Sequence, residues 1–262
     1  HAVEDPGNVS VAIAEMHGFG TARLKYLGQV AETCRQHARW VNASLRDGFL
    51  PLVLGGDHSV TIGTVAGLAG FYRRQKKKIG LIWLDAHADM NTPESTRTGN
   101  IHGMPLACCL GLGTPALTRI GGFTPKVEPG HAVLIGAREI DDSEKDNVRN
   151  SGLRVFTMRD VDERGMRAVM QEALAIATRD TAGFCATVDM DFVDPEVAPG
   201  VGSPVRGGAT YREAHLAMEM IADSGALLGL ELVEVNPVID EHNRTAYLAV
   251  ELALSAFGKK IL

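Results

Sequence analysis

The most informative stretch of the sequence is Gly80–Pro105, GLIWLDAHADMNTPESTRTGNIHGMP. It opens with an apolar run, Leu81–Leu84, of the kind that forms a strand buried on both faces of a parallel sheet. Asp85, His87 and Asp89 follow at every second position, and in an extended backbone this spacing puts the three side chains on one face. Carboxylate and imidazole groups together suit a hard or borderline divalent metal ion. The stretch therefore predicts a metal site at the end of a buried strand, although an isolated triplet also fits a polar loop that caps a helix.

The composition is that of a globular protein with a substantial core. Of the 262 residues, 45% are hydrophobic and 22% charged, which fits one large α/β domain or two small ones. The formal net charge of −6 gives no basic footprint for nucleic acid. No apolar run approaches the roughly 20 residues needed to span a bilayer, and no signal peptide is visible.

From these features we expect a cytoplasmic protein with neither a nucleic-acid nor a membrane partner. The cysteines match no zinc motif and fit reduced thiols in the core; they are Cys34, Cys108, Cys109 and Cys185.

Segments typical of strands and of helices alternate along the chain. Strands are predicted at Phe49–Leu54, Leu81–Leu84, Ala132–Ile135, Leu153–Phe156, Phe184–Asp191 and Leu227–Val235, and the first three of these are apolar runs that predict burial. Helices are predicted over Thr21–Asp47, Val60–Tyr72, His102–Gly111, Asp141–Asn150, Asp160–Thr178, Tyr211–Asp223 and Asn243–Phe257. This alternation predicts the α/β class, with residues 1–262 forming a single three-layer α/β/α domain around a mostly parallel central sheet.

Polar side chains follow five of the predicted strands. Ligands of such sheets bind outside the carboxyl ends of the strands, and the groups predicted there are His58, Asp85–Asp89, Asp141 with Glu144, Asp189 with Asp191, and Glu234. Helix capping explains some of them. It does not explain two aspartates, Asp189 and Asp191, facing one way, because unpaired carboxylates repel each other. A bound cation removes that repulsion.

The inventory of metal ligands exceeds what one structural ion needs. It comprises His58, Asp85, His87, Asp89, Asp189 and Asp191. Two-metal sites hold their ions about 3.5–4 Å apart and generate hydroxide near neutral pH. Oxygen-rich ligation with some imidazole favours manganese, while the ligand types alone also allow iron, cobalt or zinc.

Three segments resemble the metal motifs of the ureohydrolase superfamily: Gly55–Ser59 (GGDHS), Asp85–Asp89 (DAHAD) and Asp189–Pro195 (DMDFVDP). Further segments resemble the bacterial type of its arginase branch: Asn91–Pro93 (NTP), Gly99–Pro105 (GNIHGMP), Glu234–Pro237 (EVNP) and Ser255–Lys260 (SAFGKK). The match runs over essentially the whole chain in the same order. It implies an arginase/deacetylase-like fold.

The resemblance implies two Mn²⁺ ions per subunit and a role in arginine metabolism, including the urea cycle. One ion would be held by His58, Asp85, Asp89 and Asp189. The other would be held by His87, Asp85, Asp189 and Asp191, with Asp85 and Asp189 as bridges. A metal-bridging hydroxide would attack the guanidinium carbon of L-arginine and give L-ornithine and urea.

The resemblance also implies roles for other polar residues. Glu234 would orient the guanidinium, His102 would relay a proton to the leaving amine, and Asp89 would count as catalytic as well as a ligand. The amino-acid end of arginine would be bound by Asn91, Thr98, Asn100, Asp141, Glu144 and Ser203. Alternatively, Asp141 and Glu144 are an acidic pair at a helix N-terminus, and His102 is a loop histidine that caps the next helix.

The chain departs from the family pattern at two places. Thr98 stands where arginases commonly have Ser; it keeps the hydroxyl and adds a methyl group, so weaker substrate binding is expected. Arginases also carry a first strand and a glycine-rich loop ahead of the matched region, for which this chain has no counterpart. If the protein truly lacks this strand, we expect its neighbours in the sheet to be left unpaired or to re-pair; the favoured alternative is that the sequence is part of a longer chain.

Three other functions remain open. An agmatinase or another guanidino-compound ureohydrolase would keep the metal ligands and differ in the loop Asn91–Asn100. A catalytically silent arginase-like subunit would lack a ligand or the proton relay, and all are present here. A zinc deacetylase of related fold would need one metal ion and fewer aspartates. Because the family commonly forms trimers or pairs of trimers, the resemblance implies a homo-oligomer, either a trimer or a hexamer.

Overall fold

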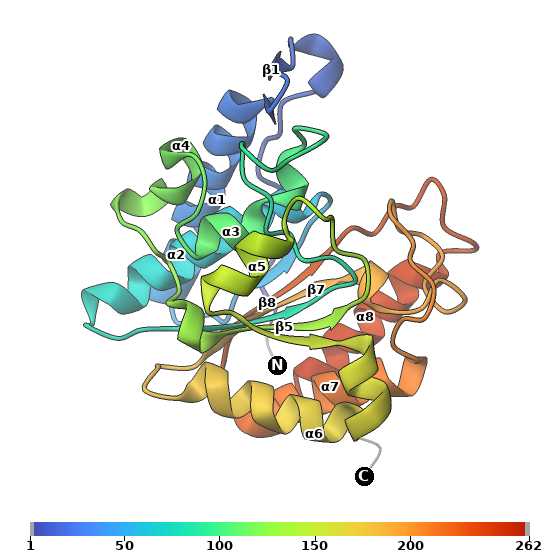
Figure 1. The fold of residues 1–262 in the computed structure, drawn as a ribbon. Coiled ribbons are helices and arrows are strands. Elements are labelled where there is room, and N and C mark those ends of the chain that lie inside the picture. Colours follow the sequence, from blue (N-terminus) through green and yellow to red (C-terminus); the bar gives the residue numbers. More distant parts are fainter. Residues whose placement is uncertain (1–2, 260–262) are drawn as a thin grey trace.

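Six parallel strands form the central sheet, in the order β3-β8-β7-β4-β5-β6 (Figure 1). This computed structural model describes residues 3–259. The strands are β3 (Leu52–Leu54), β4 (Gly80–Leu84), β5 (Ala132–Ala137), β6 (Arg154–Thr157), β7 (Phe184–Asp189) and β8 (Leu227–Val233). Every neighbouring pair in this sheet is parallel, which confirms the predicted sheet.

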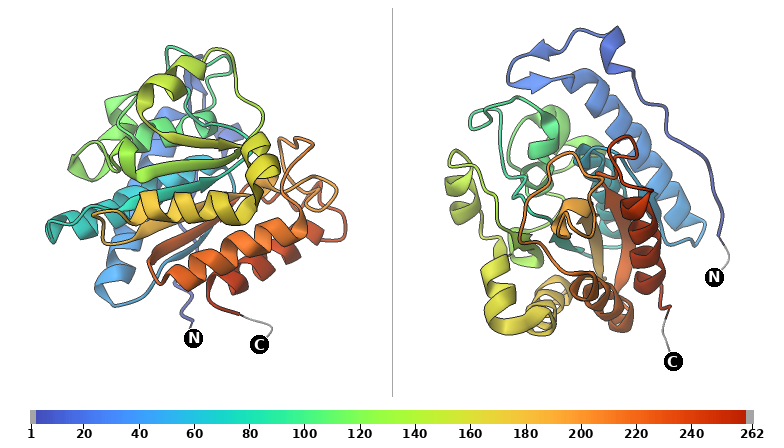
Figure 2. Two further views of the ribbon diagram at one scale, coloured as in Figure 1. Left: turned by 60° about the horizontal axis from the view of Figure 1, so that its bottom comes forward. Right: turned by 90° about the vertical axis from the view of Figure 1, so that its right-hand side faces the viewer.

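Helices cover both faces of this sheet, so the chain forms the predicted three layers (Figures 1 and 2). One face carries α1 (Leu27–Arg46), α2 (Thr61–Arg74), α3 (Pro105–Cys109), α4 (Pro115–Thr118) and α5 (Lys145–Ser151). The other carries α6 (Met158–Thr178), α7 (Tyr211–Ser224) and α8 (Arg244–Ala256). Both α6 and α7 begin with a capping box, in which a threonine and an acid three residues later satisfy each other's backbone N–H groups.

The central strand β4 shows how the two cores are built. Ile82 and Leu84 pack into the apolar cluster that includes residues of α6, α7 and α8. Leu81 and Trp83 pack into the opposite cluster, with residues of α2 and α3. All five residues of β4 are buried, because both faces of the sheet are covered. The apolar run therefore formed the predicted strand, and its carboxyl end is fixed within the core.

The prediction of a buried strand at Phe49–Leu54 was wrong. The strand spans only Leu52–Leu54, and its side chains are substantially exposed, Leu52 at 42% and Leu54 at 72%. The reason is its position, since β3 is an edge strand that pairs with β8 alone among the described strands.

Three predicted helices begin later than the sequence suggested, and one of them is α5, which begins at Lys145 instead of Asp141. Helix α1 begins at Leu27 instead of Thr21, because Gly20–Thr21 (β1) and Leu24–Lys25 (β2) pair as a short antiparallel hairpin ahead of it. The helix predicted from His102 begins at Pro105, which occupies its first turn, and a separate 3₁₀ turn, η3 (Ile101–Gly103), carries His102. His102 therefore lies on a connection and not within a helix.

Two further observations concern membrane-spanning helices and the C-terminal end of the described residues. No helix of residues 3–259 has the length and apolarity to cross a membrane. Lys260, which ends the SAFGKK motif, lies outside the described residues.

Candidate active site

The loops that follow β3, β4, β5, β7 and β8 meet around a cavity of about 290 Å³ at the carboxyl edge of the sheet. The cavity is lined by His58, His87, Asp89, Asn91, Thr96, Thr98, Asn100, His102, Gly103, Glu139, Asp141, Glu144, Asp189, Asp191, Ser203 and Glu234. Every predicted site residue is among them except Asp85, which is buried. The structure thus brings together side chains from segments far apart in the sequence.

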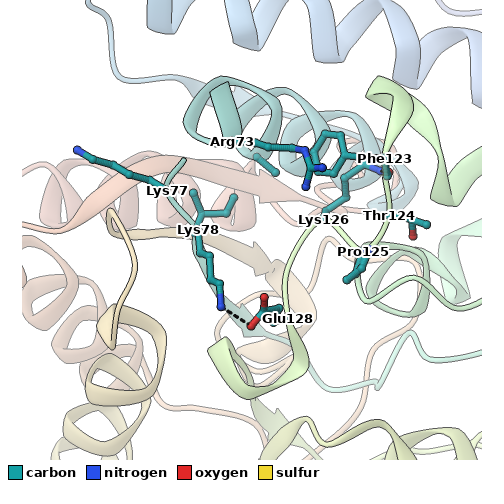
Figure 3. A pocket seen from close by; sticks show the side chains of 10 residues that line it. Arg73, Lys77, Lys78, Phe123, Thr124, Pro125, Lys126 and Glu128 are labelled. Atoms are coloured by element: carbon teal, nitrogen blue, oxygen red, sulfur yellow. Dashed lines mark hydrogen bonds and ion pairs between the residues drawn. The ribbon is translucent and has the colours of Figure 1, made fainter. Parts of the chain in front are cut away.

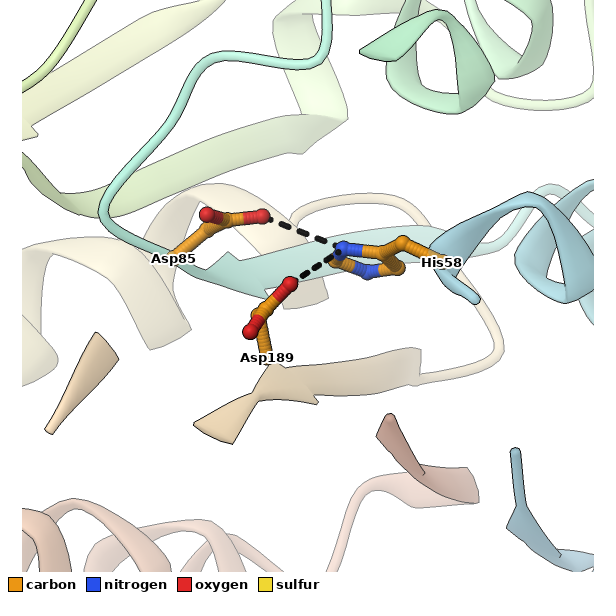
Figure 4. A group of neighbouring side chains, drawn as sticks. All are labelled: His58, Asp85 and Asp189. Carbon is orange, nitrogen blue, oxygen red and sulfur yellow. Dashed lines mark ion pairs between the residues drawn. The ribbon is translucent and has the colours of Figure 1, made fainter. Parts of the chain in front are cut away.

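His58 is the centre of a first group of metal-ligating atoms (Figure 4). Its Nδ1 lies 3.1 Å from Asp85 Oδ2, 3.2 Å from Asp189 Oδ2 and 3.2 Å from Asp89 Oδ2. The imidazole comes from η2 (His58–Val60) after β3, and Asp189 ends β7. One imidazole and three carboxylates thus converge from three strand ends, and their role as ligands of the first ion stays a prediction.

His87 is the centre of a second group. Its Nδ1 lies 3.0 Å from Asp191 Oδ2 and 3.5 Å from Asp85 Oδ1. Asp85 therefore belongs to both groups, with Oδ2 facing His58 and Oδ1 facing His87. A carboxylate placed in this way could contribute one oxygen to an ion in each group. The carboxylate of Asp189 is grouped with His58 and not with His87, so its second bridging role stays a prediction.

The predicted reason for this convergence was wrong, although the predicted side chains do lie close together. The strand β4 ends at Leu84, so Asp85–Asp89 is not extended. The backbone turns instead, and Asp89 has a φ of 51°. Its carbonyl accepts a hydrogen bond of 3.1 Å from Ala107 N, which helps to hold this left-handed conformation. Such conformations are costly for a residue other than glycine and concentrate at functional sites.

Short turns place the next ligand beside each of two aspartates. Asp85 Oδ1 accepts a hydrogen bond from His87 N, and Asp189 Oδ1 accepts one from Asp191 N. An aspartate that accepts from the backbone two residues ahead mimics a tight turn. Asp191 accordingly lies in η6 (Met190–Phe192) and not on an extended strand. The turns therefore give the one-sided arrangement that the sequence interpretation ascribed to strand pleating.

Trp83 contacts Asp85 and His58 of the first group, and the sequence analysis did not identify it as a functional residue. Its indole Nε1 donates to Asp85 Oδ2 at 2.8 Å. Its ring stacks on His58, with the centroids 4.2 Å apart. A Trp at this position could have been noted, because a buried indole N–H needs an acceptor.

The two histidines are poised to bind cations or protons. Burial opposes the charged form of His87, but the contacts with Asp191 and Asp85 outweigh it and raise its pKa to about 11. For His58, burial again opposes protonation, and the contacts with Asp189 and the other two carboxylates raise its pKa well above the usual value. Without a metal ion, protons on these rings therefore neutralise part of the carboxylate charge.

The carboxylates respond in opposite directions. Burial acts to raise the pKa of Asp85, but its contacts with both histidines hold that pKa below its usual range. Burial and the charge of Asp85 raise the pKa of Asp89 to about 8, and they raise the pKa of Asp189 as well. This crowding of like charges is what a divalent cation relieves.

The donors fit a pair of divalent cations. His58 Nδ1 and Asp89 Oδ2 are buried and have no hydrogen-bond partner within residues 3–259, although they lie 3.2 Å apart. Buried polar atoms are rarely left unpaired. Carboxylate oxygens with imidazole nitrogens, and no thiolate, are also the donor types that borderline divalent ions prefer.

Metal binding should release protons and become tighter as the pH rises. The proton on His87, whose pKa is raised to about 11, must leave before Nδ1 can bind an ion. Raising the pH removes this competing proton, so affinity should increase with pH across the neutral to alkaline range. Calorimetric titration of Mn²⁺ in two buffers of different ionisation enthalpy measures the protons released. Equal heats in both buffers, with the ion bound, would contradict the assignment of His87 as a ligand.

Glu234 lies at the end of β8 in a second left-handed conformation, with a φ of 64°. Its N–H donates to Gly56 O, while its Oε1 accepts from His58 N, each at 2.8 Å. These reciprocal bonds fasten the loop after β8 to the loop after β3. Burial raises the pKa of Glu234, while the bond from His58 N lowers it. The carboxylate is thus held beside the metal groups on the wall of the cavity.

Three of the predicted substrate residues, Asn91, Asp141 and Glu144, form a connected network in the lining of the cavity. Asn91 Nδ2 donates to Asp141 Oδ2 at 3.3 Å. Glu144 accepts from Met90 N at 2.9 Å and from Asp141 N at 3.1 Å. Its carboxylate makes no capping bond to α5, but Glu144 occupies the N-cap position of that helix, so the alternative of an acidic pair at a helix N-terminus stays open. Burial raises the pKa of Glu144 to about 7, against the lowering effect of these two bonds.

The N-terminal hairpin supports the loop that carries Asn91, Thr98 and Asn100. Arg23 Nη1 donates to the carbonyl oxygens of Pro93 and Glu94, at 3.0 and 2.8 Å. Gly99 has a φ of 75°, and a Cβ there would lie 1.9 Å from Ala22 O. No residue pattern signalled this contact, because the hairpin has little periodicity of its own.

Sequence reasoning missed three residues that line the cavity, namely Thr96, Gly103 and Glu139. Glu139 could have been found, because it is an acid two residues before Asp141 at the end of a predicted strand. His102 lies at the mouth with 43% of its side chain exposed, and its Nδ1 is 3.8 Å from Asp57 Oδ2. An exposed imidazole at the rim of a site can exchange protons with solvent.

A second hollow lies at the opposite edge of the sheet, beside the amino end of β4 (Figure 3). Arg73 and Lys126 both approach the Phe123 ring, at 4.8 and 4.5 Å from its centroid. Glu128 pairs with Lys78 at 2.8 Å. This hollow, of about 140 Å³, lacks the metal-ligating set of the first cavity. Within residues 3–259, the groups of side chains able to hold a metal ion thus lie at the carboxyl edge.

Comparison with known proteins agrees with this geometry. The model of the arginase family matches residues 1–258. The arginase of Bacillus caldovelox is 50% identical over 99% of this chain and 86% of its own length. Its native structure superposes with a TM-score of 0.93 at 49% identity, covering 98% of this chain and 85% of that one.

More distant arginases also share the fold. The arginase of Entamoeba histolytica, solved in complex with L-ornithine, has a TM-score of 0.84 at 32% identity, covering 92% of this chain and 80% of that chain. The chain belongs to the arginase family.

Proposed function

We propose that this protein hydrolyses the guanidinium group of L-arginine to L-ornithine and urea, with two Mn²⁺ ions as cofactors. The observation that supports this most is the single cavity that joins two histidine–carboxylate groups to Glu234 and to the Asn91–Asp141–Glu144 network. Membership of the arginase family and the likeness to curated arginases support the same activity.

The ions would be held by His58, Asp85, His87, Asp89, Asp189 and Asp191. Bound there, two divalent ions would supply a water activated near neutral pH and would stabilise the charge that develops during attack. Ligand types alone favour manganese without excluding iron, cobalt or zinc.

Two residues of this chain would act on the guanidinium end of arginine, one by orienting it and one by transferring a proton. Glu234, fixed through Oε1 by His58 N, would accept hydrogen bonds from the guanidinium and hold its carbon beside the metal groups. His102, half-exposed at the mouth, would pass a proton to the departing amine of ornithine. The carboxylate at position 234 is thus proposed for orientation and the imidazole for proton transfer.

The amino-acid end would be bound on the opposite wall. Asp141 and Glu144 would receive the α-ammonium, directly or through water. Asn91, Thr98, Asn100 and Ser203 would offer neutral donors to the α-carboxylate. Thr98 Oγ1 already accepts from Asn100 N at 3.2 Å, which leaves its hydroxyl hydrogen free to donate. These contacts would select arginine over guanidino compounds that lack the α-carboxylate.

The experiment that tests this function compares L-arginine with agmatine, which lacks the α-carboxylate, after incubation with Mn²⁺. We expect urea and ornithine from arginine, a much lower rate with agmatine, and loss of both on chelation. Urea from agmatine alone would keep the metal chemistry and overturn the proposed substrate. Metal binding without urea from either compound would favour a silent subunit.

Asp141→Ala should raise KM for arginine by about 10–100-fold, the value of a charge-assisted hydrogen bond. It should change KM far less for 5-guanidinopentanoate, which has the carboxylate and the guanidinium but no α-ammonium. Asp142→Ala is the matched control, because Asp142 is exposed and pairs with Lys145 instead of lining the cavity. An equal effect of Asp141→Ala on both substrates would remove Asp141 from ammonium binding.

We also propose that the chain is one domain over residues 1–262 and acts in cytoplasmic arginine metabolism as a homotrimer or hexamer. The support is the family likeness over nearly the whole chain. Light scattering of the purified protein gives the mass, and a monomer of 28.0 kDa would contradict the assembly.

A further inference from the structure

A carboxylate that the proposed chemistry does not use lies deep beneath the metal groups. Glu231, in the middle of β8, is fully buried at 0% exposure. Within residues 3–259 it forms no ion pair, and its partners are three threonine hydroxyls. Thr61 and Thr187 donate to Oε1, and Thr64 donates to Oε2. A buried carboxylate without a cation is costly, so its retention needs a reason.

The direction of these hydrogen bonds determines which nitrogen of His58 carries a hydrogen. A carboxylate only accepts, so Thr187 must use its single hydroxyl hydrogen on Glu231, at 3.0 Å. Thr187 Oγ1 also lies 3.0 Å from His58 Nε2. With its hydrogen engaged, Thr187 can only accept there, so Nε2 must carry the N–H. Nδ1, which faces three carboxylates, is then the nitrogen whose lone pair can bind an ion.

The same carboxylate has a second arm that leads away from the metal groups. Thr64 donates to Glu231 Oε2, and its Oγ1 lies 2.9 Å from His37 Nε2. His37 belongs to α1 and is absent from the cavity and from both groups of metal-ligating atoms. Glu231 therefore connects one histidine that faces the site and one that does not, through equivalent threonines.

We propose that Glu231 is a positioning residue for metal binding, acting through Thr187 to fix the tautomer and orientation of His58. The inference rests on the proposed metal centre and adds the residue that prepares one of its ligands. Partners of this kind, one bond beyond the ligand, alter metal affinity by about 10–100-fold when they are removed.

The decisive test is a pair of matched variants, Thr187→Val and Thr64→Val. Each removes one hydroxyl of similar burial from the same carboxylate, and only Thr187 contacts His58. Calorimetric titration with Mn²⁺ at fixed pH gives stoichiometry and affinity, and thermal unfolding of the metal-free proteins gives stability. We expect both variants to lose stability, but only Thr187→Val to weaken Mn²⁺ binding at one site, by about 10–100-fold. Thr187→Ser, which keeps the hydroxyl, should restore that affinity.

A double-mutant cycle then tests whether Glu231 acts through Thr187. Glu231→Met keeps the length of the side chain and removes both acceptors. We expect it to weaken Mn²⁺ binding as Thr187→Val does, and the double variant to lose no more affinity than either single variant. Additive losses would show that Glu231 acts by another route. If Glu231→Met does not fold, the comparison of Thr187→Val with Thr64→Val decides alone.

These outcomes separate this inference from the proposed function. Equal Mn²⁺ affinity in Thr187→Val, Thr64→Val and the wild type would overturn the positioning role while leaving arginine hydrolysis intact. A wild type that binds Mn²⁺ without hydrolysing arginine would overturn the proposed function, and the affinity difference between the two variants would still test the positioning role. A wild type that binds no Mn²⁺ would contradict both.

Discussion

Asp85→Asn should abolish most arginine hydrolysis, lowering kcat/KM by at least about 10³-fold, because activation of water by the ions supplies several kcal/mol. Asp85 is the one carboxylate shared by both groups of metal-ligating atoms. The change keeps the shape of the side chain and removes the negative charge that would bridge the ions. Elemental analysis should find less than one Mn²⁺ per chain.

Two controls make this prediction specific. His87→Ala removes a ligand of the second group only, so it should leave one bound ion. Asp162→Asn changes an exposed carboxylate on α6 and should leave metal content and activity as in the wild type. Two Mn²⁺ ions in the Asp85→Asn variant would refute the bridging assignment, whatever happens to the rate.

Glu234→Gln should lower kcat/KM for arginine by about 10²–10³-fold, comparable to the loss of one hydrogen-bonding group aimed at the transition state. The amide keeps an oxygen that can accept from His58 N, so the loop should remain in place. What disappears is the negative charge proposed to face the guanidinium. Steady-state kinetics and metal analysis on the same sample measure the two effects together.

Metal content is the control for Glu234→Gln, and it should stay at the wild-type value because Glu234 belongs to neither group of metal-ligating atoms. A variant with normal metal content and normal kcat/KM would remove Glu234 from substrate binding. Loss of metal together with activity would instead make Glu234 a support of His58, to whose backbone it is bonded.

The metal-ligating residues could be predicted from the sequence because their chemistry is unusual and their positions follow apolar runs. Asp189 and Asp191 illustrate this, since two acids one residue apart at the end of a buried strand favour a bound cation whatever the local backbone does. The backbone itself could not be predicted. The left-handed turn at Asp89 depends on the hydrogen bond from Ala107 N, a contact made only in the folded chain.

The exposure of β3, and the residues that contact His58 or its hydrogen-bond partner, were harder to predict for the same reason. The run that contains Leu52 and Leu54 has the apolar composition of a buried strand, and only the order of strands places it at the edge. Trp83 and Glu231 read as ordinary members of strands, yet the folded chain places both against His58 or its partner. Periodicity reports which residues are buried, whereas these roles depend on which residues meet.

The most direct test of the central claim is urea release measured while Mn²⁺ is added stepwise to metal-free protein. If two ions held by the six histidine and aspartate ligands drive hydrolysis, the rate should stay low through the first equivalent and rise with the second. Asp85→Asn should show no rise at any Mn²⁺ concentration at which the wild type is saturated. Full activity with one ion per chain, or activity that survives complete removal of metal, would contradict the account.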